Sequence, residues 1–275
     1  MAMTARQGRV RLRAVLGGFV LVSAAVAAGC AQLLAGALTA GQALLLTPET
    51  EVAIGKQAAE EYLRGRSRIA IQAIQDEVTA VGMAVAARST RPGAEYSFTA
   101  ITGSEINAFA LPGGPIFITQ GLLAKLGDEA QLAGVLAHEV AHVAERHGIN
   151  RLREALVLKG IAIAAIGDQP ALLRQAAGIA LDLILKGRDR ASEDEADILG
   201  IRWMRQAGYD PRAVVDTLQT LAEVGDVPGF LVWASDHPAL ADRITQARRV
   251  ITSENLAGGA RNADKYLRVM APIKQ

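Results

Sequence analysis

Three of the four histidines in this chain of 275 residues lie in one short segment, VLAHEVAHVAERHG, at residues 135–148. His138 and His142 are four residues apart, so on a helix both rings project from the same face, about one turn apart. Two imidazoles at that spacing can reach one zinc ion at bond lengths of about 2.0–2.1 Å. Glu139 stands beside the first histidine, where it could take a proton from a water molecule at the metal. The segment therefore predicts a metal site.

The stretch HEVAH matches HExxH, a pattern typical of zinc-dependent peptidases. A buried helix whose histidines only form hydrogen bonds would also fit, so a third ligand is needed to decide. A later histidine ligand of the HExxHxxGxxH type is excluded, because Glu145 and Gly148 occupy the glycine and histidine positions. His147 misses that position by one residue. We expect His147 in the C-terminal turn of the helix, which Gly148 would end.

A second segment, ASEDEADILG at residues 191–200, offers the missing ligand. Glu193 and Asp197 are four residues apart and share one face of a helix. One carboxylate could bind the metal while the other holds a ligand imidazole by its second nitrogen, which is a common arrangement at metal sites. Asp194 and Glu195 are interpreted as solvated residues near the start of a helix, where acidic side chains are favoured.

Composition limits the kind of protein that positions these groups. Of the residues, 51% are hydrophobic, 21% are charged and 4% are aromatic, and the formal net charge is +1. This composition supplies one core and favours helices, and it gives no strongly basic face, so we expect no nucleic-acid partner. The single cysteine, Cys30, excludes an internal disulfide and a cysteine-based zinc finger.

Helices, a small sheet and further helices are predicted in that order. The first helix covers residues 47–65, with Thr47 as its N-cap and Pro48 in its first turn, and the second covers residues 68–88. Three short strands are predicted at residues 94–101, 106–111 and 115–119. From Gly127 onward the pattern is helical. The predicted fold class is α+β: a mainly helical domain with a small three-stranded sheet beside the HExxH helix.

The N-terminal residues differ from the rest of the chain. A basic stretch with four arginines is followed by LGGFVLVSAAVAAGC, which predicts a secretory signal peptide over residues 1–29. The ending AAGC resembles a bacterial lipobox, in which Cys30 would be lipidated and would hold the mature chain at a membrane. Ala27 stands where that pattern prefers leucine, so a plain signal peptide or a retained anchor stays an alternative. Ala31, in place of an aspartate, favours the outer membrane.

The remaining boundaries follow from these patterns. Residues 30–46 are predicted to be a linker, residues 47–254 the peptidase-like domain, and residues 255–275 a peripheral tail. The apolar segment at residues 156–187 is too interrupted to span a bilayer, so we expect it to pack in the core, with a membrane-facing or partner-facing surface as the alternative.

The two acidic and histidine-containing segments together resemble the M48 family of zinc metallopeptidases. HEVAH is followed after about fifty residues by EDEAD, in the family's HExxH…ExxxD order. The segments NAFALPGGPIFIT and SDHPALADRI are also similar to that family, and the resemblance spans roughly Thr47 to Val250. It implies a gluzincin fold, that is, a zinc peptidase whose third ligand is a glutamate, with one zinc ion per chain.

The resemblance also implies a role for each residue of the site. The zinc ligands would be His138, His142 and Glu193. Glu139 would be the general base of peptide hydrolysis, and Asp197 would orient a ligand histidine. His237 and Arg243, six residues apart as in the family's HPxxxxR, would approach the site from a late loop. There His237 would stabilise the oxyanion, or act as a reversible fourth ligand that keeps the site closed.

The strand INAFAL could pair with an extended substrate backbone. The substrate-binding residues would be Asn107, Ala108, Phe109 and Ala110. We expect a metalloendopeptidase that cleaves unfolded or misassembled proteins on the periplasmic side of a bacterial cell envelope. The alternatives are a zinc-binding but latent or inactive chaperone-like lipoprotein and a structural lipoprotein without metal. Glu139 argues against a pure binder, which needs no base at that position.

Overall fold

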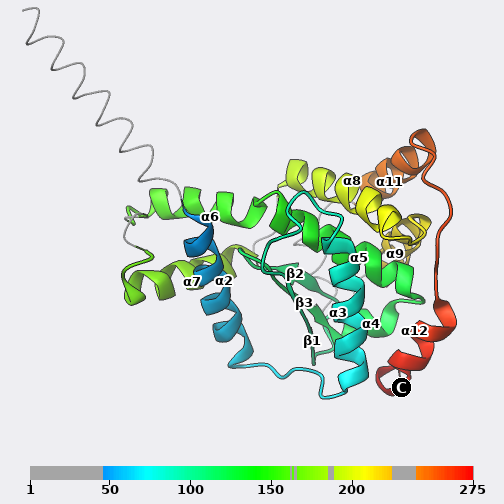
Figure 1. The fold of residues 1–275 in the computed structure, drawn as a ribbon, viewed down its shortest axis with the longest axis horizontal. Helices are drawn as coiled ribbons and strands as arrows, with labels where there is room; N and C mark the ends of the chain where they lie inside the picture. Colours follow the sequence, from blue (N-terminus) through cyan, green and yellow to red (C-terminus); the bar gives the residue numbers. More distant parts are fainter. Residues whose placement is uncertain (1–45, 162, 164–165, 185–188, 225–239, 275) are drawn as a thin grey trace, which may run out of the picture. The chain divides into compact units, whose positions relative to one another are not determined.

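The computed structural model describes residues 46–161, 163, 166–184, 189–224 and 240–274 (Figure 1). The predicted signal peptide, the lipidation site at Cys30 and the loop residue His237 lie outside these ranges. The described part of the chain is mostly helical and contains one three-stranded sheet, so the predicted α+β class is confirmed.

The order of elements also matches the prediction. The helices before the sheet are α2 (Pro48–Leu63) and α3 (Gln72–Ala86). The strands are β1 (Ser97–Ile101), β2 (Ala108–Ala110) and β3 (Pro115–Thr119). The later helices are α4 (Gln120–Lys125), α5 (Glu129–Ala144), α6 (His147–Leu158), α7 (Pro170–Ile184), α8 (Arg190–Gln206), α9 (Arg212–Val224), α11 (Leu240–Ser253) and α12 (Ala263–Met270).

The sheet has the strand order β1–β3–β2, so its middle strand is the last in sequence. β1 pairs in parallel with β3, and β2 pairs with β3 in antiparallel fashion with Phe109 opposite Phe117. Helix α3 packs against β1, and α5 packs against β2. Among the described strands, β2 therefore lies at one edge of the sheet, and every residue of β2 is buried.

Helix α5, which carries HEVAH, lies in the middle of the core. Its N-cap Asp128 accepts a hydrogen bond of 2.8 Å from the backbone N–H of Gln131, which satisfies one of the free donors at the helix start. Every residue of α5 except Val135 is buried, because α3, α8, α9 and the sheet pack around it. The most extensive of these contacts is with α8, which runs beside α5 (Figure 1).

Helix starts are set by local capping. Thr47 accepts a hydrogen bond from the N–H of Thr50 at 3.2 Å and Pro48 follows it, as predicted for the start of α2. At the start of α8, Asp189 accepts a hydrogen bond from the N–H of Ser192 at 3.0 Å. This cap fixes where α8 begins, and so it sets which side of the helix carries Glu193.

The C-terminal segment is not the peripheral tail that the sequence suggests. In α12, Tyr266 and Met270 are four residues apart, share one helix face and are fully buried in the main core. The Tyr266 hydroxyl donates a hydrogen bond of 2.7 Å to the carbonyl of Leu123. This short amphipathic helix was not predicted, because the glycine- and asparagine-containing stretch before it is typical of a peripheral tail.

Several residues of the apolar segment between α5 and α8 pack inward. Leu156, Ile163 and Ala176 are buried in a cluster with Ile54 of α2, in agreement with the predicted core packing. Leu158, at the end of α6, is 88% exposed. In the described ranges, no helix combines the length and the apolar character needed to cross a membrane.

Candidate metal centre

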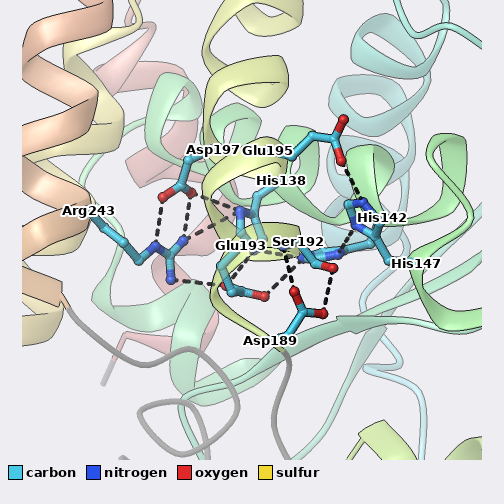
Figure 2. A network of polar contacts seen from close by, with 9 residues as sticks. All are labelled: His138, His142, His147, Asp189, Ser192, Glu193, Glu195, Asp197 and Arg243. Atoms are coloured by element: carbon cyan, nitrogen blue, oxygen red, sulfur yellow. Dashed lines mark hydrogen bonds and ion pairs between the residues drawn. The ribbon is translucent and has the colours of Figure 1, made fainter. Parts of the chain in front are cut away.

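The HEVAH face of α5 is buried inside the protein. His138, Glu139 and His142 are only 8%, 1% and 3% exposed. The helix presents the two imidazoles to α8 on the same side, one turn apart, as their spacing predicts (Figure 2). Polar groups at this depth require partners, because an unpaired buried polar group costs about 1–3 kcal/mol.

Helix α8 can approach α5 closely because it carries a glycine at the contact. A Cβ atom at Gly200 would lie 3.1 Å from the backbone nitrogen of His138, so a larger side chain would push the two helices apart. The close approach brings both Glu193 and Asp197 of α8 onto the histidine face of α5. Both carboxylates are buried, at 1% and 3% exposure.

Three donor groups converge at this contact. His138 Nε2 lies 3.1 Å from His142 Nε2 and 3.3 Å from Glu193 Oε2, and His142 Nε2 lies 3.2 Å from Glu193 Oε1. Donors bound tetrahedrally to zinc at about 2.0–2.1 Å are separated by about 3.3–3.4 Å. Two imidazoles and a carboxylate are also ligands that zinc prefers. This donor set therefore fits one zinc ion, with a fourth position left for another ligand.

Each ligand candidate on α5 is held by its other ring nitrogen. His138 Nδ1 lies 2.9 Å from Asp197 Oδ1 (Figure 2). Arg243 of α11, also buried, donates hydrogen bonds of 2.7 Å to both oxygens of Asp197. With His138 Nδ1 donating to Asp197, the lone pair of His138 Nε2 faces the donor set. The structure thus brings Arg243 to the site from a part of the chain that is far away in sequence.

The carboxylates at this centre stabilise positive charge on His138. Burial disfavours the protonated form of His138, but the charge of Glu193 and the hydrogen bond with Asp197 outweigh burial and raise the pKa of His138 to about 9. Burial also disfavours the ionised form of Asp197, yet the charge of Arg243 and the hydrogen bond from His138 lower its pKa to about 2. Asp197 is therefore held ionised between Arg243 and His138.

The structure corrects the expectation for His147. Helix α5 ends at Ala144, Arg146 adopts a left-handed conformation with φ of 60°, and His147 is the first residue of α6. This turn folds His147 back toward the preceding helix, where its Nδ1 lies 2.9 Å from Nδ1 of His142. Gly148 therefore lies inside α6 and does not end the HExxH helix.

Glu195 is a solvated residue near the start of α8, as expected, but it also makes a contact that was not expected. Its side chain is 55% exposed, yet Oε2 lies 3.0 Å from Nε2 of His147. His147 and Glu195 were missed because helical spacing relates residues of one helix, whereas this contact depends on the turn at Arg146. The histidine five residues after His142 was the available clue.

A pocket opens beside Glu139 and His138 and is also lined by residues of α8, α9 and α11. A second pocket lies next to His142 and His147. Ala110, at the end of β2, lines this second pocket. The donor set thus borders two pockets, and the edge strand β2 reaches one of them.

The comparisons with known proteins agree on a family. The model of peptidase family M48 matches residues 72–251, well over half of the chain. The beta-barrel assembly-enhancing protease of Yersinia pestis is 28% identical over 219 residues, which cover 74% of this chain and 44% of that protein. The mitochondrial metalloendopeptidase OMA1 of Schizosaccharomyces pombe is 35% identical over 140 residues, covering 50% of this chain and 41% of that protein. The chain thus spans less than half the length of these two relatives.

The matched region contains both segments that supply the converging donors. His138 and His142 come from α5, and Glu193 comes from α8, in the HExxH…ExxxD order of the family. Three such groups can hold one metal ion between them. This chain belongs to peptidase family M48.

Proposed function

We propose that this protein is a zinc-dependent endopeptidase that cleaves unfolded or misassembled proteins of the cell envelope. The observation that carries this proposal is the convergence of His138, His142 and Glu193 beside the buried Glu139. A metal with three protein ligands keeps one position for chemistry, which is the usual difference between a catalytic and a structural zinc site.

The residues of the centre would share the work of peptide hydrolysis. Bound zinc would supply a Lewis acid that polarises the scissile carbonyl and makes a water molecule more acidic. Glu139 would accept a proton from the attacking water and pass it to the leaving amine, because it directly follows a ligand on α5. Asp197 would hold His138 in the tautomer that offers Nε2 to the metal, and Arg243 would keep Asp197 ionised.

Strand β2 is proposed to bind the substrate main chain, through Asn107, Ala108, Phe109 and Ala110. Among the described residues, β2 pairs with another strand on one edge only, and Asn107 Oδ1 is buried without a hydrogen-bond partner. An extended peptide along β2 would add main-chain hydrogen bonds, and one of its amide N–H groups could donate to Oδ1. Recognition of the main chain suits unfolded substrates, because it does not depend on particular side chains.

The location is proposed from the sequence. Lipidation at Cys30 would tether the mature chain to a membrane, on the periplasmic side and in the outer membrane. Envelope substrates are supported by the name of the Yersinia pestis relative, a beta-barrel assembly-enhancing protease. A Cys30→Ser chain should move from the membrane fraction to the soluble fraction after cell lysis, and an unchanged membrane fraction would contradict the tether.

His237 is proposed to stabilise the oxyanion or to close the site as a reversible fourth ligand. These two roles predict opposite effects of His237→Ala on casein cleavage. Loss of an oxyanion stabiliser lowers kcat, whereas loss of a closing ligand raises the rate of cleavage. A rate equal to that of the wild type would contradict both roles.

The decisive experiment measures bound zinc and casein cleavage in four full-length chains: the wild type, Glu139→Gln, Glu193→Gln and the control Glu60→Gln. Glu60 is an exposed glutamate of α2, away from the donor set. We expect zinc in the wild type, in Glu139→Gln and in the control, and weaker zinc binding in Glu193→Gln. Cleavage should occur in the wild type and the control only.

Two results would contradict the proposal in different ways. Zinc in the wild type without cleavage of any protein would favour the chaperone-like alternative or a latent enzyme. No zinc in the wild type, even after zinc is supplied, would mean that the donor set is a hydrogen-bonded cluster of a buried helix pair.

A further inference from the structure

Behind the proposed ligand His142 stands a second imidazole. His142 Nδ1 lies 2.9 Å from His147 Nδ1, and His147 Nε2 lies 3.0 Å from Glu195 Oε2 (Figure 2). The two rings are inclined at 69° with their centroids 5.0 Å apart. His147 is 9% exposed, whereas the side chain of Glu195 is 55% exposed. This chain of contacts therefore runs from the buried donor set to the protein surface.

Metal binding determines the position of each proton in this chain. If His142 binds the metal through Nε2, its proton lies on Nδ1. This Nδ1–H group then donates a hydrogen bond to Nδ1 of His147. His147 then accepts at Nδ1, carries its proton on Nε2 and donates to the carboxylate of Glu195. Each ring nitrogen has one role, and both neutral imidazoles have all their hydrogen-bonding groups satisfied.

We propose that His147 and Glu195 are positioning residues that fix the ring orientation and tautomer of the zinc ligand His142, an inference that rests on the proposed function. The two histidine ligands are thus supported differently. His138 donates directly to a buried, arginine-paired carboxylate, whereas His142 reaches its carboxylate through a neutral ring. At other metal sites, removal of such a partner lowers metal affinity or activity by about 10–100-fold.

The backbone holds His147 in this place. Arg146, the residue before it, has a left-handed φ of 60°, which turns the chain from α5 into α6. The Arg146 guanidinium forms an ion pair of 2.9 Å with the buried Glu51 of α2 and donates a hydrogen bond of 3.3 Å to the carbonyl of Leu46. These contacts stabilise the turn, so His147 is presented to His142 by a fixed backbone.

The test compares zinc affinity of full-length variants by competition with a chromophoric chelator. His147→Phe keeps an aromatic ring but removes the acceptor, whereas His147→Asn keeps an acceptor near the position of Nδ1. Glu195→Ala removes the outer carboxylate, Glu195→Gln keeps an acceptor oxygen, and Glu154→Ala removes an exposed carboxylate of α6 as the matched control. Circular dichroism of the metal-free chains checks that each variant folds.

The expected result is graded. His147→Phe should weaken zinc binding by about 10–100-fold, and His147→Asn should recover most of that loss. Glu195→Ala should weaken binding more than Glu195→Gln, and Glu154→Ala should match the wild type. In the zinc-loaded wild type, nitrogen-15 NMR should place the proton of His142 on Nδ1 and that of His147 on Nε2.

Three results would overturn the inference. A folded His147→Phe chain that binds zinc as tightly as the wild type would show that the relay does not position His142. The opposite tautomer for His147 would show the same. In both cases cleavage by the wild type would leave the proposed function intact. A wild type that binds no zinc would instead overturn the function, and the relay with it.

Discussion

Arg243→Met removes a buried guanidinium that pairs with Asp197 and, at 3.4 Å, with Glu193 Oε2. Asp197 and Arg243 are 3% and 4% exposed, and the guanidinium donates two hydrogen bonds of 2.7 Å to the carboxylate. Methionine keeps much of the volume of the arginine stem, so the main loss is the positive charge. Breaking a buried pair from one side costs about 3–5 kcal/mol, because the remaining charge stays buried. We expect the free energy of unfolding of the metal-free chain to fall by about that amount.

The double variant Asp197→Leu/Arg243→Met separates stability from metal binding. Apolar replacement of both buried charges is often neutral or stabilising. The Nδ1–H group of His138 would lose its acceptor, however, which costs about 1–3 kcal/mol of stability. The double variant should therefore be more stable than Arg243→Met. It should nevertheless bind zinc about 10–100-fold more weakly than the wild type, because His138 has lost its positioning carboxylate.

Urea unfolding in the presence of a chelator measures the stabilities, and chelator competition measures zinc affinity. Arg190→Met is a matched control, because Arg190 and its partner Asp242 are 65% and 60% exposed. Exposed pairs of this kind contribute about 0–1 kcal/mol. The reasoning is refuted if Arg243→Met loses no more stability than Arg190→Met, or if the double variant is less stable than Arg243→Met.

Four further predictions follow from other contacts. Gly200→Val should weaken zinc binding far more than Gly200→Ala in chelator competition. A Cβ atom at this position lies 3.1 Å from the backbone nitrogen of His138, so a bulkier side chain must displace α8. Equal affinities would contradict the tight contact. Free zinc at 100 times its Kd should stabilise the native state by about 2.7 kcal/mol, so adding a chelator should lower the Tm measured by calorimetry. An unchanged Tm would contradict metal binding to the native state. Tyr266→Phe should cost about 0.5–1.5 kcal/mol in urea unfolding if α12 belongs to the core, and no loss would contradict that role. Hydrogen bonds from Arg212 lower the pKa of Asp210, so the ionised carboxylate stabilises the fold above its ordinary pKa of 3.8, and this contribution is lost as the pH falls below that value. Asp210→Asn should therefore destabilise the chain at pH 7 but much less at pH 2. An equal loss at both pH values would contradict the charge-based explanation.

Sequence reasoning worked where a single helix relates the residues. The spacing of four between His138 and His142, and again between Glu193 and Asp197, requires only that each segment be helical. Both segments are helical, and the structure brings the two pairs together. The fold class was also predicted, because strand alternation and helical periodicity change clearly between residues 88 and 127.

Sequence reasoning failed where the path of the chain between elements decides the contact. His147 lies beside His142 only because Arg146 reverses the chain in a left-handed conformation, which an arginine rarely adopts and no local pattern announces. Glu195 of α8 then contacts His147 at the start of α6, and no spacing within one helix relates these two residues. Tyr266 was missed for a different reason: its eight-residue helix follows a glycine- and asparagine-containing stretch that is typical of a peripheral tail.

The contact between α5 and α8 at Gly200 also has a consequence for the entropy of metal capture. The proposed ligands His142 and Glu193 are separated by about fifty residues. For a flexible chain, bringing the ends of such a loop together costs on the order of 3 kcal/mol, or about two orders of magnitude in an equilibrium constant. In the folded protein, helix packing has already closed this loop. The third donor is thus present at a high effective concentration, and a HEVAH peptide mixed with free carboxylate would lack this advantage.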